Sequence, residues 1–469
     1  MLTLLIVFIW GISIFSAGHA LLSKRDPRAG LGWIVTCLAL PGFGAFCYWL
    51  LGVNRIRTKA RELQSQGQGM HWMETSPPES AGTTEVVGCG CLLNLSNEVT
   101  RRPLTFKNSV EVLYNGEQTY PAMLEAIRTA QEHIFLSSYI FQADKTGRLF
   151  VRELTAAAER GVDVRVLTDA FGERYSLPTA RRLLRGSKVK TTNFLPPSLS
   201  RRSFYLNMRN HRKLLIVDSR YGFTGGMNIW DRHLAAIKNN ARRVIDIHFR
   251  LEGPVCAHLR DAFMEDWHFA TNEVRHHRDW PEAPSSGTAI CRGISAGPNE
   301  IHEKLNWILI GALSCARHRV RIMTPYFIPT RAQLAAINAA SLRGVQVEIL
   351  LPEKNNLPFV DWASRGYLYE LLEYDTMVYY QPPPFVHSKM LLIDDEYALV
   401  GSANLDPRSL RLNFEFNVEI IDRNLVGELI RHFDHARQHS SEVSMEQLER
   451  RSIPERMRNA FCKLFSPYL

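Results

Sequence analysis

Two related stretches of sequence decide how this chain of 469 residues is interpreted: Asn210-His211-Arg212-Lys213-Leu214-Leu215-Ile216-Val217-Asp218 and Val386-His387-Ser388-Lys389-Met390-Leu391-Leu392-Ile393-Asp394. The first continues to Gly225-Gly226-Met227-Asn228, and the second to Gly401-Ser402-Ala403-Asn404. In both copies lysine follows histidine by two positions, aspartate by seven, glycine by fourteen and asparagine by seventeen. A match at five positions predicts an internal duplication that carries a functional site.

The residues that precede each copy predict the same alternation of helices and strands. In chain order these are helix 123–130, strand 134–139, helix 149–160 and strand 162–167, and then helix 308–316, strand 320–326, helix 332–342 and strand 345–350. Alternating helices and strands are typical of an α/β fold whose sheet is covered by helices. We therefore expect a body built from two copies of one α/β unit.

Strand geometry indicates which motif residues act together. The histidine and lysine of each copy lie two positions apart, so their side chains share one face of a strand. Asp218 and Asp394 fall on the opposite face, about 23 Å further along a straight strand, and we expect them to be structural ion-pair partners. Tyr139 and Tyr326 end the preceding strands in equivalent positions, and either line the site or pack in the core.

A later acid is a better partner for each imidazole. Glu415 lies in an alternating stretch of the second copy, and Asp246 holds the matching place in the first. We expect each carboxylate to accept the Nδ1–H of the histidine of its own copy, Asp246 from His211 and Glu415 from His387, which leaves Nε2 free to react. The spacing from histidine to acid differs between the copies, 35 residues (211 to 246) against 28 (387 to 415).

This set of side chains suits reactions at phosphorus. A neutral imidazole is a nucleophile, and a protonated one is a general acid. In-line displacement requires the two on opposite sides of the phosphorus atom, so two copies facing each other across a twofold axis supply both. We expect Lys213 and Lys389, with the amides of Asn228 and Asn404, to bind the non-bridging oxygens. This mechanism requires no metal and no cofactor, and the spacing leaves open which histidine attacks.

The paired motifs, together with Asn413-Phe414-Glu415 and Phe263-Met264-Glu265-Asp266-Trp267, resemble the phospholipase D superfamily and, within it, the bacterial cardiolipin synthases. The resemblance covers nearly the whole chain and implies two phospholipase D-like α/β units with pseudo-twofold symmetry. It implies a catalytic set of His211, Lys213, Asp218, His387, Lys389 and Asp394. The implied reaction is a reversible phosphatidyl transfer between two phosphatidylglycerol molecules through a phosphatidyl-histidine, giving cardiolipin and glycerol. By the same resemblance His211 is the nucleophile, and His387 acts first as acid and then as base.

The charge of the chain suits an anionic partner. Lys and Arg number 56 against 47 Asp and Glu, a net charge of +9, which fits nucleic acid, an anionic membrane or a phosphate-bearing substrate. We expect phosphatidylglycerol and anionic membrane lipids rather than nucleic acid, because a soluble nuclease needs no apolar N-terminus. Lipid hydrolysis, transfer to another head group, and a membrane-tethered nucleic-acid phosphodiesterase stand as alternatives. The sequence leaves the oligomeric state open.

The first 53 residues predict a membrane hairpin. The segments 2–22 and 31–53 carry no Asp, Glu, Lys or Arg, and each is long enough to cross a hydrocarbon core of about 30 Å. Pro41-Gly42 interrupts the second segment, which either spans or re-enters the membrane. Basic residues after it favour a cytoplasmic body. We expect a multi-pass protein of the bacterial inner membrane.

These patterns divide the chain into two transmembrane segments (1–53), a basic flank and linker (54–106), a first phospholipase D-like unit (107–285, motif 206–233), a second (286–440, motif 382–409) and an amphipathic tail (441–469). The linker is rich in Gln, Ser, Gly and Pro, which is typical of a flexible connection. The tail either lies in the membrane interface or docks on the body. The eight cysteines are too dispersed for a disulfide framework, and we expect them to be reduced.

Overall fold

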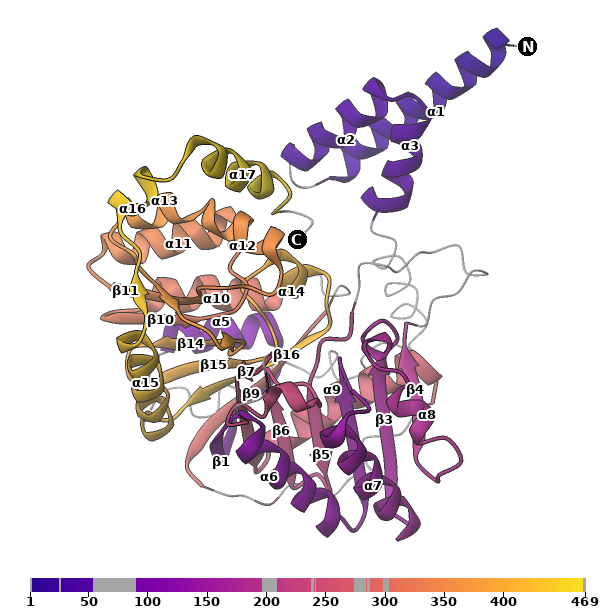
Figure 1. Cartoon of the computed structure of the whole chain (residues 1–469), viewed down its shortest axis with the longest axis vertical. Helices are drawn as coiled ribbons and strands as arrows, with labels where there is room; N and C mark the ends of the chain where they lie inside the picture. Colours follow the sequence, from indigo (N-terminus) through magenta and orange to yellow (C-terminus); the bar gives the residue numbers. More distant parts are fainter. Residues whose placement is uncertain are drawn as a thin grey trace. The chain divides into compact units, whose positions relative to one another are not determined.

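The computed structural model describes residues 2–24, 27–53, 90–195, 209–237, 240, 242–273, 284, 287–297 and 303–466. The chain forms two compact units, and each is considered by itself. The described part of the first unit is residues 2–24 and 27–53. All other described residues belong to the second unit, which we call the body (Figure 1).

The first unit consists of helices that follow one another closely. They are α1 (Leu2–Ser23), α2 (Pro27–Ala39), α3 (Phe43–Cys47) and a π-helical turn, η1 (Tyr48–Gly52). Among the described residues, α1 alone, with 22 residues, is long and apolar enough to cross a membrane. At about 1.5 Å per residue it reaches roughly 33 Å.

The second apolar segment is broken. Helix α2 ends at Ala39 and α3 begins at Phe43, because the ring of Pro41 disfavours a helical conformation at the residue before it and Gly42 adopts a positive φ of 79°. The second segment is therefore interrupted at the Pro41-Gly42 break that the sequence indicates, and whether it spans or re-enters the membrane stays open.

The body is built on strands from both copies of the motif. The strands are β1 (Thr105–Tyr114), β2 (His133–Ser138), β3 (Asp163–Asp169), β4 (Lys190–Phe194), β5 (Leu214–Val217), β6 (Tyr221–Gly225), β7 (Val244–Ile245), β8 (Ile247–Glu252), β9 (Ala289–Ala296), β10 (Arg319–Met323), β11 (Gln346–Pro352), β12 (Met377–Gln381), β13 (Phe385–Val386), β14 (Met390–Ile393), β15 (Tyr397–Gly401), β16 (Glu415–Ile421) and β17 (Ser441–Glu442). Fifteen of them form one continuous sheet, and β7 pairs with β13 separately.

The order of the strands shows the duplication. Strands β1 and β9 pair antiparallel in the middle of the sheet. Outward from β1 the order is β8-β6-β5-β2-β3-β4, and outward from β9 it is β16-β15-β14-β10-β11-β12, with β17 at the far edge. In each half the three outer strands, β2-β3-β4 and β10-β11-β12, run parallel. Apart from β17, each strand of one half thus has a counterpart in the other, and the body has pseudo-twofold symmetry.

Helices cover both faces of this sheet (Figure 1). They are α5 (Gly90–Thr100), α6 (Asn115–Thr129), α7 (Lys145–Glu159), α8 (Ala180–Leu183), α9 (Val255–Thr271), α10 (Lys304–Cys315), α11 (Arg331–Leu342), α12 (Pro358–Arg365), α13 (Leu368–Leu372), α14 (Pro407–Arg411), α15 (Arg423–Gln438), α16 (Met445–Glu449) and α17 (Ile453–Leu464), with 3-10 turns η3 (Gly172–Tyr175) and η4 (Asp231–His233). Helices α9 and α15 pack in one core shared by both halves. Helices α6 and α7, and α10 and α11, form a separate core for each half on the other face.

Helix α5 and a disulfide differ from the expectations. Helix α5 and the start of β1 lie within 54–106, so the prediction of a flexible linker is wrong for residues 90–106; residues 54–89 lie outside the described residues. Cys91 of α5 and Cys315 of α10 form a disulfide with a Cα–Cα distance of 6.7 Å, so the expectation of reduced thiols is wrong for this pair. Their separation of 224 residues is a tertiary contact that no local spacing indicates.

Candidate active site

Each motif histidine lies beside a segment of the opposite half. His211 precedes β5, and its backbone N–H donates to the carbonyl oxygen of Phe414 at 2.9 Å. His387 follows β13, and its N–H donates to Ile245 at 2.8 Å, where β13 pairs parallel with β7. The residue that follows Phe414 is Glu415, and the residue that follows Ile245 is Asp246. The backbone pairing therefore brings each histidine next to the acid of the other copy.

The side chains follow this crossed arrangement. The Nδ1 atom of His211 lies 3.0 Å from Oε2 of Glu415, and Nδ1 of His387 lies 2.9 Å from Oδ2 of Asp246. The expectation that each acid serves the histidine of its own copy is wrong. Each acid stands at the start of β16 or β8, one strand from the central β1–β9 pair, where it is closer to the histidine loop that crosses from the other half.

The surroundings of the buried acids favour their ionised forms, and those of the imidazoles favour the neutral form. Burial alone would raise the pKa of Asp246, but the hydrogen bond from His387 and the charge on Lys389 hold it at about 2, and the pKa of Glu415 is likewise lowered by His211 against the effect of burial. Burial and the charge on Lys389 lower the pKa of His387 to about 4. A carboxylate only accepts hydrogen bonds, so Nδ1 carries the proton and the lone pair is on Nε2.

The charge of each motif lysine acts on the histidine of the other copy as well as on that of its own. Burial lowers the pKa of Lys213 to about 7 and that of Lys389 to about 8. The Nζ of Lys213 donates to the carbonyl oxygen of His211 at 2.7 Å, and Lys389 makes the same contact with His387. Burial chiefly lowers the pKa of His211, and the charge on Lys389, from the opposite copy, lowers it further. Lys213 acts in the same way on His387.

The motif aspartates lie in turns and bind backbone. Asp218 accepts the N–H groups of Gln131, Glu132 and His133 at 2.8–2.9 Å. Asp394 makes the equivalent contacts with residues 317, 318 and 319. Both aspartates have a positive φ, near 50°. The expectation of ion pairs is wrong: each carboxylate fastens the turn that starts β2 or β10.

The glycine at the fourteenth position is required by backbone geometry. Gly225 and Gly401 have φ values of 152° and 153°, a region that other residues rarely adopt. A Cβ at Gly401 would lie 2.4 Å from the carbonyl oxygen of Phe416. The next residue is Gly226 in one copy and Ser402 in the other; Ser402 donates to Oε2 of Glu415 at 2.5 Å, whereas a Cβ at Gly226 would collide with the Asp246 carboxylate.

The motif asparagines are held by other polar groups. The Oδ1 of Asn228 accepts from the N–H of Ile140 at 3.2 Å, and the Nδ2 of Asn404 donates to Ser409 at 3.2 Å. The backbone N–H of Asn228 donates to Nε2 of His233, whose ring centre lies 6.4 Å from that of His387. Sequence reasoning missed His233. The constant offset of 176 positions between the copies (211 to 387) pairs it with Ser409, so the repeat gives no signal for a histidine at this position.

Two tyrosines line the histidines. The rings of Tyr139 and His211 have centres 5.2 Å apart, and those of Tyr326 and His387 have centres 6.4 Å apart. The Nζ of Lys213 lies 5.7 Å from the centre of the Tyr139 ring. Of the two alternatives left open by the sequence, these contacts favour side chains that line the site.

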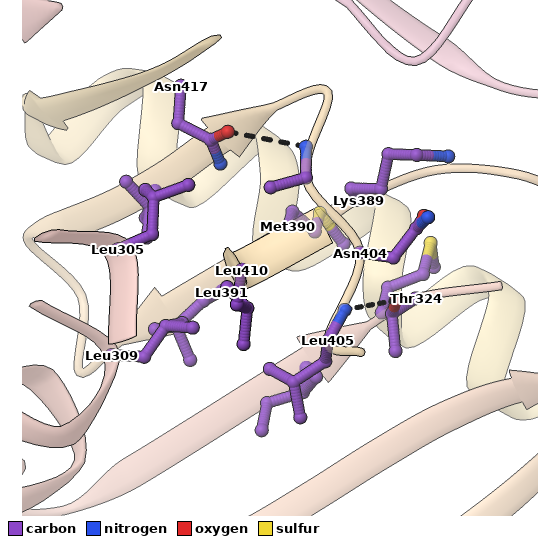
Figure 2. A pocket seen from close by; sticks show the side chains of 14 residues that line it. Leu305, Leu309, Thr324, Lys389, Met390, Leu391, Asn404, Leu405, Leu410 and Asn417 are labelled. Atoms are coloured by element: carbon purple, nitrogen blue, oxygen red, sulfur yellow. Dashed lines mark hydrogen bonds between the residues drawn. The ribbon is translucent and has the colours of Figure 1, made fainter. Parts of the chain in front are cut away.

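A small cavity lies behind Lys389 and Asn404 in the second half. Its walls are largely apolar and include Leu309, Leu391 and Leu405 (Figure 2). The volume is about 30 Å³, which is room for one or two water molecules. This cavity is therefore too small for an organic ligand.

Comparisons with known proteins agree with this arrangement. A family model described as "Cardiolipin synthase, PLD-like domain" matches residues 123–267 and 309–437. The chain is 32% identical over 468 residues to the probable cardiolipin synthase YwiE of Bacillus subtilis, covering 98% of this chain and 92% of that protein. It is 33% identical over 440 residues to cardiolipin synthase A of Pseudomonas aeruginosa, covering 91% and 88%. Among solved structures, the phosphatidylserine synthase of Haemophilus influenzae superposes with a TM-score of 0.65 at 16% identity, over 81% of this chain and all of that one; it shares the fold.

Proposed function

Because this chain belongs to the family of cardiolipin synthases with a phospholipase D-like domain, we propose that it transfers a phosphatidyl group from one phosphatidylglycerol to another, giving cardiolipin and glycerol. The chain is a phosphatidyltransferase of this family. The observation that supports this reaction most is the crossed pair of acid–imidazole contacts, 3.0 Å at His211 and 2.9 Å at His387, with two buried lysines acting on both rings.

The first step forms a covalent intermediate. The Nε2 lone pair of His211 attacks the phosphorus of phosphatidylglycerol, and the bond from phosphorus to the glycerol oxygen breaks. Protonated His387 gives its Nε2 proton to that oxygen, and glycerol leaves. In the empty site both imidazoles are neutral, but a bound phosphodiester anion favours the imidazolium form of His387. Lys213 and Lys389 offset the charge that develops on the non-bridging oxygens.

The second step reverses these roles. Neutral His387 removes the proton from a glycerol hydroxyl of a second phosphatidylglycerol, and the resulting oxygen attacks the phosphatidyl-histidine. The bond from phosphorus to Nε2 of His211 breaks, cardiolipin is released, and the proton remains on His387 for the next cycle. No atom is lost, and the reaction is reversible. Asp246 and Glu415 keep the protons of Nδ1 in place through both steps.

The direct test is a product analysis. Purified full-length protein is incubated with phosphatidylglycerol, labelled in its head group, in vesicles, and the lipids are separated. Cardiolipin with free labelled glycerol is the expected result. Phosphatidic acid as the sole lipid product would identify a hydrolase and overturn the transfer reaction. His211→Ala and His387→Ala are each expected to abolish turnover.

A substrate with an activated leaving group separates the two histidines. A phosphatidyl ester of p-nitrophenol needs no proton to release its leaving group, so His387→Ala is expected to release one equivalent of p-nitrophenol and to accumulate the adduct. His211→Ala is expected to release none. The opposite outcome would make His387 the nucleophile.

We also propose where the enzyme acts. Helix α1 anchors it in the bacterial inner membrane, with the body on the cytoplasmic side, and its partners are phosphatidylglycerol and other anionic lipids rather than nucleic acid. The proposed functional units are residues 107–285 and 286–440. Support comes from α1 as a candidate span and from the lipid enzymes among its relatives. Protease protection of tags placed at either end of the chain tests the orientation.

A further inference from the structure

Helix α17 is fastened to the body by one of its faces. Cys462 is buried on this face, and Ser466, just after the helix, accepts a hydrogen bond from the hydroxyl of Tyr367 at 2.8 Å. The Nζ of Lys463 donates to the carbonyl oxygen of Gly366, also at 2.8 Å. These contacts hold α17 against the end of α12 (Figure 1). This face of α17 therefore docks on the body, which is one of the two alternatives that the sequence left open for the tail.

The opposite face of α17 is apolar and exposed. The exposed fractions are 71% for Ile453, 68% for Met457, 57% for Phe461, 74% for Leu464 and 40% for Phe465. At about 100° per residue around the helix axis, these five side chains fall within an arc of roughly 120°. We call this set the α17 stripe. A continuous exposed apolar stripe on a structured helix indicates an interaction surface rather than scattered surface residues.

Basic side chains border the stripe on both edges. By the same rotation, Arg456 falls on one side and Arg458 on the other. Within α17 the charged residues are these two arginines, Lys463 and Glu455, an excess of two positive charges. The exposed Arg456 extends towards lipid phosphates while the stripe enters the acyl region. The guanidinium of Arg458 instead packs on the ring of Trp362 in α12 and faces Glu455. This combination of apolar stripe and basic border fits an anionic bilayer.

The stripe also leads to the active site. The ring of Phe465 contacts that of Phe359 in α12, with centres 5.8 Å apart. Two residues before α12, the Oδ1 of Asn356 accepts a hydrogen bond from the hydroxyl of Tyr326 at 2.8 Å, and Tyr326 lies against His387. The surface formed by α12 and α17 is thus connected to the histidines through Asn356 and Tyr326.

We propose that the α17 stripe is a second membrane attachment of this protein, which docks the body on the surface of an anionic phospholipid bilayer beside the active site. This attachment is separate from α1 and does not depend on which phosphatidyl transfer the site performs. It keeps the site at the lipid surface, so that a head group reaches the histidines without leaving the bilayer.

The first test measures depth in the membrane. Full-length protein is reconstituted in vesicles of phosphatidylglycerol and phosphatidylcholine, with an NBD label on Leu464→Cys, and the unsubstituted protein is labelled in parallel as the blank. The matched control is Leu342→Cys at the end of α11, where the native side chain is 72% exposed. We expect blue-shifted emission and quenching by nitroxide-labelled acyl chains at 464 and neither at 342. An aqueous spectrum at 464 would overturn the proposal.

The second test measures the consequence for turnover. Leu464→Asp is expected to lower the rate on vesicle substrate by at least about tenfold, since it removes the burial of one large apolar side chain and adds a charge. With short-chain phosphatidylglycerol dispersed as monomers its rate is expected to be unchanged, as are both rates of Leu342→Asp. Conversion of a dimer into monomers by Leu464→Asp would make the stripe an interface between copies and overturn the proposal. If the wild-type protein makes no cardiolipin, the fluorescence test still decides the docking.

Discussion

Replacing Asp246 by asparagine tests the crossed pairing of acids and histidines. Asp246 is fully buried; its Oδ1 accepts the N–H of Ile247 at 2.9 Å, and its Oδ2 faces Nδ1 of His387 at 2.9 Å. In the variant the amide oxygen remains on Ile247, because that backbone donor requires an acceptor, and the NH₂ group turns to His387. Nδ1 must then accept, which moves the ring proton to Nε2.

The size of the effect follows from this change of tautomer. His387 with its proton on Nε2 has no lone pair there and cannot act as a base. The corresponding change in a hydrogen-bonded aspartate–histidine pair of a hydrolase lowers kcat by about 10⁴-fold, or roughly 5 kcal/mol at about 1.4 kcal/mol per tenfold. We expect a loss of 10³- to 10⁴-fold in cardiolipin formation. In the His387→Ala background, Asp246→Asn is expected to cost little more, because the two groups act as a unit.

The assay uses the p-nitrophenyl lipid to identify which histidine each acid serves. Asp246→Asn is expected to release one equivalent of p-nitrophenol, as is expected for His387→Ala. Glu415→Gln is expected to release none, as expected for His211→Ala. Thermal unfolding of each variant controls for loss of structure. Once the two alanine variants have identified His211 as the nucleophile, abolished release in Asp246→Asn together with preserved release in Glu415→Gln would show that each acid serves its own copy, and the crossed arrangement would be refuted.

Three further outcomes are expected. Because burial lowers the pKa of Lys213 to about 7 and that of Lys389 to about 8, raising the pH through this range removes the charge that binds the phosphodiester, and kcat/KM falls; a profile without a limb between about pH 6 and 9 would contradict this. Gly401→Ala is expected to destabilise the protein by about 2 kcal/mol or more in denaturant unfolding, because of its positive φ and its contact with backbone, whereas Gly427→Ala in α15, which has space for a Cβ, serves as the control. Chelation by EDTA is expected to leave the rate unchanged, since the lysines supply the positive charge; a strict dependence on an added divalent cation would overturn the mechanism.

The sequence predicted much of the body. The strands expected at 134–139 and 320–326 are β2 and β10, and the helices expected at 149–160 and 332–342 are α7 and α11, each within a few residues. These strands and helices are amphipathic or buried segments. Their hydrophobic periodicity is local, so it can be recognised in the sequence. The break at Pro41-Gly42 was visible too, and it falls between the end of α2 and the start of α3.

The sequence predicted which residues form the candidate site, but not which of them contact one another. Asp246 and Glu415 were identified as partners of the two imidazoles, yet the structure exchanges them. The aspartates of the motif were assigned to ion pairs, but they bind backbone N–H groups at the starts of β2 and β10. His233 was missed because a histidine outside the repeated positions carries no signal of its own.

The sequence by itself determined that this protein has two copies of one α/β unit and two sets of histidine, lysine and acid. Repeated motifs and the alternation of helices and strands are local patterns that can be recognised from residues close together in the chain. Only the tertiary structure decided which acid serves which imidazole. His211 and Glu415 lie 204 positions apart, and His387 and Asp246 lie 141 apart. Strand periodicity records the face on which a side chain lies, whereas the identity of the neighbouring segment depends on how the two halves join at β1 and β9.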